Sequence, residues 1–145
     1  MWLWCTLVTI SYPAAAYELL NKVGPAVYIG HSQGGAEIYT ILKSHPDIRF
    51  AAAISVEGGN CPDVADVALW KNIPFMYLTG DYRDPPANCP AFIDALNASG
   101  GKGTSLYLPS IGILGNDHMM MMDKNSDQVA QVVVDWIEKN VPGAK

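Results

Sequence analysis

The sequence predicts an α/β protein in which helices flank a mostly parallel β-sheet. Short runs that are apolar on both faces alternate along the chain with longer segments of helical periodicity. That alternation is typical of a buried parallel sheet whose strands are connected by helices. The chain has 145 residues, of which 50% are hydrophobic. It is therefore globular and long enough for at most one domain.

Each expected strand is a run of Val, Ile, Leu, Ala or aromatic residues. The expected strands are Ala26–Ile29, Ala51–Val56, Pro74–Thr79 and Thr104–Leu108. Helices are predicted at Pro13–Lys22, at Gln33–Lys43, at Ala91–Ala98 and from Ser126 onward, with Ser126 as the N-cap. The apolar residues of the last helix recur at helical spacing and are Val129, Val132, Val133, Trp136 and Ile137.

Charge and hydropathy exclude two classes of partner. Acidic residues number 14 against 9 basic ones, for a net charge of −5, and no basic cluster is present. Nucleic acid is therefore not an expected partner. No apolar stretch reaches the roughly 18 residues of a membrane span. The apolar stretch 1–10 lacks the positive charge of a signal peptide, so we expect a lead-in segment or a ragged edge there.

The pentapeptide Gly30-His31-Ser32-Gln33-Gly34 is the most informative motif. A strand-like run precedes it and a helix-like segment follows, which is the context of a nucleophile elbow. Gly30 and Gly34 are expected to flank the turn because a side chain at either position would clash. Ser32 Oγ would then stand at a helix N-terminus, where the backbone N–H of Gln33 can face a developing oxyanion. His31, beside the serine, is expected to point into the fold and to be structural.

Four loops follow the four expected strands, and each carries a residue with catalytic chemistry. In chain order they hold Ser32, Glu57, the pair Asp81 and Asp84, and His118. The carboxyl ends of parallel strands meet at one edge of a sheet, where α/β proteins place their sites. His118 is the predicted general base. The acid is open between Glu57, Asp84 and Asp81, since the two aspartates also suit the turn beside Pro85-Pro86.

Two cysteines follow neighbouring expected strands. Cys61 and Cys89 would lie above the same sheet edge and could pair, or they could remain two buried thiols. The histidines and cysteines show no metal-ligand spacing, and there is no phosphate loop or dinucleotide fingerprint. We therefore expect no metal and no cofactor.

The chain resembles the C-terminal half of an α/β-hydrolase. More closely, it resembles a group of exported bacterial esterases with a Ser-His-Glu triad. The stretches that carry this resemblance are Gly30–Gly34, Ser55–Glu57 with Cys61-Pro62, Phe92–Gly103, Gly115–Met121 and Asp135–Ile137.

The resemblance implies a role for each site residue. Ser32 would be the nucleophile, His118 the base and Glu57 the acid, with Gln33 N–H as one oxyanion-hole donor. The reaction would be hydrolysis of a small carboxylic ester through an acyl-enzyme, without a cofactor. The alternatives are a non-catalytic binding protein of the same fold, a lipase- or peptidase-type hydrolase, and a truncated product with no activity of its own.

The same resemblance implies that Cys61 and Cys89 are bridged and that the protein is periplasmic or secreted. The sequence departs from the family at its start, because the strands before the elbow and the loop with the second oxyanion donor are not found. We therefore expect residues 1–145 to be a partial domain belonging to a longer enzyme.

Overall fold

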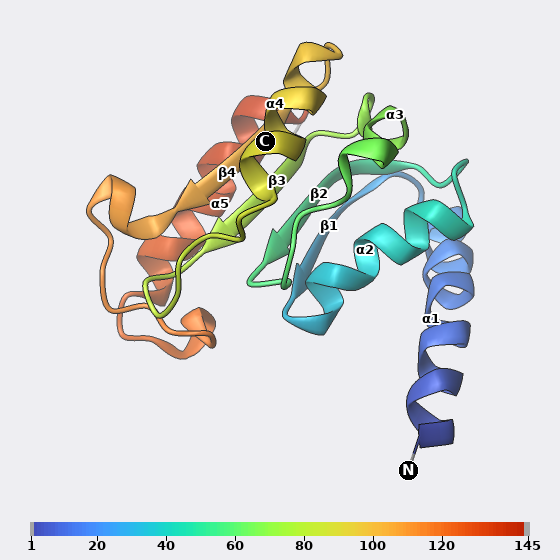
Figure 1. Cartoon of the computed structure of the whole chain (residues 1–145), viewed down its shortest axis with the longest axis horizontal. Coiled ribbons are helices and arrows are strands. Elements are labelled where there is room, and N and C mark those ends of the chain that lie inside the picture. The colour runs from blue at the N-terminus through green and yellow to red at the C-terminus, as the bar shows by residue number, and fades with distance from the viewer. Residues whose placement is uncertain (1, 144–145) are drawn as a thin grey trace.

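A computed structural model describes residues 2–143, and side chains from residue 12 onward (Figure 1). Four strands form one parallel sheet in the order β1-β2-β3-β4. They are β1 (Ala26–His31), β2 (Phe50–Val56), β3 (Phe75–Thr79) and β4 (Gly103–Tyr107). The predicted α/β class and parallel sheet are confirmed.

Five α-helices connect and cover these strands within the described residues. They are α1 (Trp2–Val23), α2 (Gln33–Ser44), α3 (Val67–Trp70), α4 (Cys89–Ala98) and α5 (Ser126–Asn140). Short 3₁₀ turns lie at Val64–Asp66, Leu108–Ile111 and Met120–Met122. Helix α3 was not predicted, because four residues are too few to show a helical period.

Two helix starts differ from the prediction. The first helix begins at Trp2 and continues through Pro13, so the expected lead-in segment is helical, while Met1 lies outside the described residues. The N-cap of α5 is Asn125, and Ser126 is the first helical residue. The carbonyl of Asn125 accepts hydrogen bonds from Gln128 N–H and Val129 N–H, which defines the cap position.

The sheet is buried between two helical layers. Figure 1 shows α2, α3 and α4 on one face of the sheet and α5 on the other. Strand β3 illustrates the pleat, since Phe75 and Tyr77 join the first layer while Met76 and Leu78 join the α5 layer. All four of these side chains are fully buried, as expected for a strand that is apolar on both faces.

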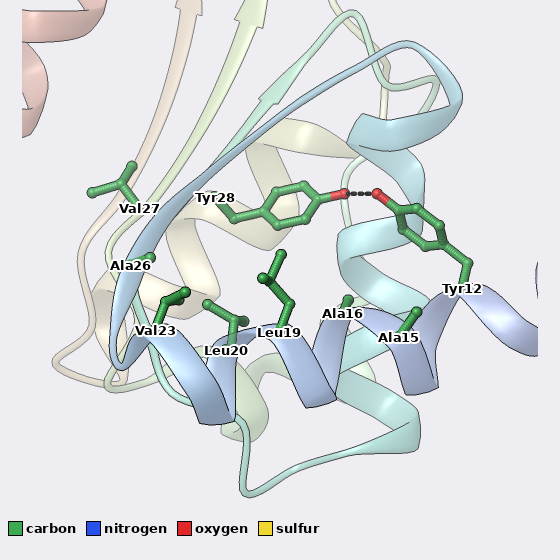
Figure 2. Close-up of a pocket in the computed structure, with 9 residues that line it drawn as sticks. All are labelled: Tyr12, Ala15, Ala16, Leu19, Leu20, Val23, Ala26, Val27 and Tyr28. Carbon is green, nitrogen blue, oxygen red and sulfur yellow. Dashed lines mark hydrogen bonds between the residues drawn. The ribbon is translucent and has the colours of Figure 1, made fainter.

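Strand β1 is an edge strand of the described sheet, since it pairs with β2 and with no other strand among residues 2–143. Its Ile29 side chain is 55% exposed. Helix α1 runs alongside, and an apolar groove of about 350 Å³ lies between α1 and β1 (Figure 2). The hydroxyls of Tyr12 and Tyr28 meet there at 2.7 Å. Burial raises the pKa of Tyr28 well above its ordinary value.

Helix α1 is also tied to the loop after α2. Tyr17 stacks on His45 with ring centroids 4.3 Å apart, and its hydroxyl donates to the Asp47 carboxylate at 2.6 Å. No helix between residues 2 and 143 has the length and apolar character needed to cross a bilayer.

Candidate active site

Ser32 lies at the turn between β1 and α2, with φ 54° and ψ −121°. A positive φ is unfavourable for a residue with a Cβ, and such strain collects at functional turns. The strand ladder holds the turn in place, because Ser32 N–H donates to the carbonyl of Val56 at 2.9 Å. The adjacent Gln33 N–H opens α2, where N–H groups have no acceptor within the helix.

The glycines around Ser32 only partly follow the prediction. A Cβ on Gly30 would lie 2.3 Å from the Gly34 carbonyl oxygen, so the close approach expected there is present. The same expectation is wrong at Gly34, where a Cβ would meet open space. The crowded position is Gly35, whose Cβ would lie 2.8 Å from Ser55 Oγ and 2.9 Å from the Gly30 carbonyl oxygen. Helix α2 therefore approaches the sheet through Gly35.

His118 reaches Ser32 across 86 residues of sequence. The His118 Nε2 and Ser32 Oγ atoms are 2.9 Å apart. This is hydrogen-bond distance, the geometry that proton transfer from a serine to an imidazole requires.

The His118 loop (residues 112–125) is held by side chains of the surrounding loops. The Asp81 carboxylate accepts the backbone N–H of Gly115 at 2.7 Å and that of Asn116 at 2.6 Å. These hydrogen bonds, chiefly the one from Gly115, hold the pKa of Asp81 below its ordinary value. Asp81 is thus occupied in supporting the loop.

His31 holds the same loop from the other side. Its Nε2 lies 2.6 Å from the carbonyl oxygen of His118, and the two imidazole centroids are 4.7 Å apart. A carbonyl oxygen accepts only, so His31 Nε2–H is the donor. This contact agrees with the structural role predicted for His31.

Glu57 follows β2 as Ser32 follows β1, and it also has φ 54°. Its side chain is buried. Oε1 accepts Gly80 N–H at 2.6 Å, and Oε2 accepts from Arg83 Nε at 2.8 Å. Glu57, Ser32, Gln33 and His118 line one open hollow of about 290 Å³.

The structure does not join Glu57 directly to His118. No hydrogen bond connects these two side chains within the described part of the chain. The Nδ1 atom of His118 instead lies 3.3 Å from the hydroxyl of Tyr82. Asp84 forms no side-chain hydrogen bond or ion pair with any residue from 12 to 143.

Tyr82 and Arg83 were missed from the sequence. Arg83 lines the hollow, and besides binding Glu57 it donates through Nη2 to the Tyr77 hydroxyl at 3.1 Å. Its guanidinium carbon lies 5.5 Å from the centre of the Tyr82 ring. Burial raises the pKa of Tyr77 to about 12. The available signal was their position between Asp81 and Asp84, in the loop that follows the third expected strand.

Cys61 and Cys89 form a disulfide that spans a sequence separation of 28. Asn88 supports it, since its side chain accepts Cys61 N–H at 3.1 Å and donates to the Cys61 carbonyl at 2.7 Å. Of the two alternatives left open by the sequence, the structure has the bridge. The bridge joins the loop after β2 to the start of α4.

Comparison with known proteins shows that this fold is also found in a solved structure. No known family profile and no curated protein matches the chain, whereas nine chains of solved structures do. One of these is described as a novel bacterial esterase solved at atomic resolution. It is 40% identical, with a TM-score of 0.81 over 89% of this chain. The present chain spans 42% of the length of that esterase. The α/β fold is therefore shared with a bacterial esterase.

Proposed function

We propose that this chain carries the active site of a serine hydrolase that cleaves carboxylic esters. The observation that carries the proposal is the 2.9 Å contact between Ser32 Oγ and His118 Nε2 at a strained strand-to-helix turn. A serine hydroxyl becomes a useful nucleophile when a base stands ready to remove its proton. The similarity to a bacterial esterase supports an ester as the substrate class.

The reaction follows from the chemistry of these groups. Ser32 Oγ attacks the ester carbonyl carbon while His118 Nε2 takes the hydroxyl proton. The tetrahedral oxyanion accepts a hydrogen bond from Gln33 N–H. The intermediate collapses, and His118 returns the proton to the leaving alcohol, which leaves Ser32 acylated. Water, deprotonated by His118, then attacks the acyl carbon, and the acid departs as Ser32 recovers its proton.

Glu57 is the proposed acid of the triad. His118 becomes positively charged in each half-reaction, so a fixed negative charge beside it lowers both barriers. Glu57 suits this role because its buried carboxylate borders the same hollow as His118. Asp81 is less suitable because it supports the backbone of the His118 loop and is not among the residues that line the hollow with Ser32 and His118. Among residues 12–143, Asp84 forms no side-chain hydrogen bond or ion pair that directs it to His118.

We further propose that the protein acts in the periplasm or outside the cell. A structural disulfide persists in oxidising compartments, and the Cys61–Cys89 bridge is compatible with one.

The hollow beside Ser32 is open and of modest size, which suits a small ester.

A fluorophosphonate probe tests the nucleophile, because it forms a bond only with an activated serine. We expect labelling of the chain at Ser32, shown by peptide mass spectrometry. We expect no labelling of Ser32→Ala and at least about 100-fold slower labelling of His118→Ala, the usual contribution of a general base.

The matched control is Ser105→Ala, which removes an exposed hydroxyl from β4 and should label like the parent chain. An unlabelled parent chain that is folded by circular dichroism would contradict the proposal and leave a non-catalytic binding protein or a truncated product without activity. Label at another residue would contradict the assignment of Ser32.

A further inference from the structure

We propose that Tyr82 is a positioning residue for His118, holding the imidazole at Nδ1 while Arg83 holds Glu57. This inference rests on the proposed function, since it refines how the base is oriented. It assigns the direct contact with the imidazole to a tyrosine hydroxyl and leaves the carboxylate to act through its charge.

The first step concerns the tautomer of His118. To accept the Ser32 proton, Nε2 must be unprotonated, so Nδ1 must carry the proton in the neutral ring. An Nδ1–H donor needs an acceptor to keep the ring in that tautomer. The group at this nitrogen is the Tyr82 hydroxyl oxygen at 3.3 Å, with the two rings edge to face and their centroids 5.6 Å apart.

The second step concerns Glu57. Each of its carboxylate oxygens already accepts a short hydrogen bond, Oε1 from Gly80 N–H at 2.6 Å and Oε2 from Arg83 Nε at 2.8 Å. Its side chain is fully buried, so leaving the pocket would break an ion pair whose loss is costly. Glu57 is therefore held by Gly80 and Arg83, and the hydrogen bond at His118 Nδ1 is left to Tyr82.

The third step is what holds Tyr82. Tyr82 is 48% exposed, and an unrestrained surface tyrosine would be a poor orienting group. The Arg83 guanidinium lies against that ring at 5.5 Å, within the range of a cation–π contact. Arg83 is itself anchored by Glu57 and by the Tyr77 hydroxyl. Two adjacent residues of one loop thus steady both His118 and Glu57.

Nitrogen NMR of the imidazole tests this assignment without relying on activity. The chain contains three histidines, so the resonances of His118 can be assigned by comparison with His45→Asn and His118→Asn. In the parent chain we expect a protonated Nδ1 and an unprotonated Nε2 at neutral pH. In Tyr82→Phe, which removes one oxygen atom, we expect these two shifts to converge as the tautomers mix.

The rate of labelling at Ser32 supplies a second readout. Net hydrogen-bond contributions correspond to a decrease of about 2- to 10-fold in Tyr82→Phe. The control is Tyr17→Phe, which also removes a hydrogen-bonded tyrosine hydroxyl, in this case one that binds Asp47. We expect Tyr17→Phe to change neither the His118 shifts nor the labelling rate.

Unchanged His118 shifts in Tyr82→Phe would overturn the proposal. If the shifts converge in Glu57→Gln instead, Glu57 is the direct partner of the imidazole. If the parent chain does not react with the probe, the proposed function fails, yet the nitrogen shifts still decide whether Tyr82 holds His118.

Discussion

Backbone strain marks two residues at the same rim of the sheet. Ser32 and Glu57 both have φ 54°, and they follow paired ends of adjacent strands, where His31 lies opposite Val56. A left-handed residue directly after a strand turns the chain sharply and lifts its own side chain above the sheet edge. The same backbone conformation therefore places both a hydroxyl and a carboxylate in the lining of one hollow.

Asp81 provides a prediction on pH at the residue scale. Its hydrogen bonds to Gly115 N–H and Asn116 N–H lower the pKa of the folded-state carboxyl. A lowered pKa stabilises the fold above the unfolded-state value of about 3.9, and that stabilisation is lost as the pH falls through the folded-state value. We expect Asp81→Asn to unfold at lower urea than the parent chain at pH 7, and the gap to narrow below about pH 4.

Urea unfolding measured from pH 3 to pH 7 by circular dichroism provides the check. Asp94→Asn is the control, because that carboxylate has no hydrogen bond within residues 12–143. A gap between Asp81→Asn and the parent chain that is independent of pH would mean that the ionised carboxylate does not support the loop.

At the scale of elements, the contact between α2 and the sheet depends on one missing side chain. Gly35 sits where a Cβ would press on Ser55 Oγ and on the Gly30 carbonyl, whereas Gly34 faces open space one residue earlier. Tyr39, one turn further along α2, donates to Ser55 Oγ at 3.2 Å. The helix thus rests on β2 through both residues, and its N-terminus stays beside Ser32.

The two neighbouring glycines give a matched pair of substitutions. We expect Gly35→Ala to lower the free energy of unfolding by about 1–3 kcal/mol, because the extra methyl must displace backbone or Ser55. We expect Gly34→Ala to be neutral or to raise it by up to about 1 kcal/mol, since alanine is the better helix former and has room. Urea denaturation of both variants is the measurement. Equal effects at the two positions would contradict the packing described for Gly35.

At the scale of the whole molecule, the faces of the sheet and its edge at β1 differ in what covers them. Helices cover both faces of β2 and β3, whereas the outer side of β1 meets no strand among residues 2–143 and borders the apolar groove beside α1 (Figure 2). The Cys61–Cys89 bridge links the loop after β2 to α4 and hence to the layer that covers β3.

The bridge yields a prediction for global stability. In the chain-entropy description, closing a loop of this length stabilises the fold by about 3–4 kcal/mol. We expect Cys61→Ala/Cys89→Ala to lose about that amount, as measured by urea unfolding. The reduced parent chain should match the double variant. A reduced chain as stable as the oxidised one would show that the bridge does not constrain the unfolded state.

Local chemistry allowed much of the fold and part of the site to be predicted. The strands around Ile54 and Leu78 are recognisable because both of their faces are apolar, and the turn at Ser32 because a glycine-flanked serine stands between a strand and a helix. The loops that follow the strands also indicated His118 as a candidate residue. These features depend on neighbours in sequence, so a single chain reveals them.

Other features depend on residues that meet only after folding. Gly35 is crowded because Ser55 and Gly58 approach it from another strand and the loop after that strand. No local sequence pattern indicates this approach. The partners of Glu57 are 23 and 26 residues away, and Tyr82 lies 36 residues from His118. The sequence by itself determined the α/β architecture and the residues available at the sheet edge. The tertiary structure decided which of them touch, because hydrogen bonds form between atoms that the crossovers bring together.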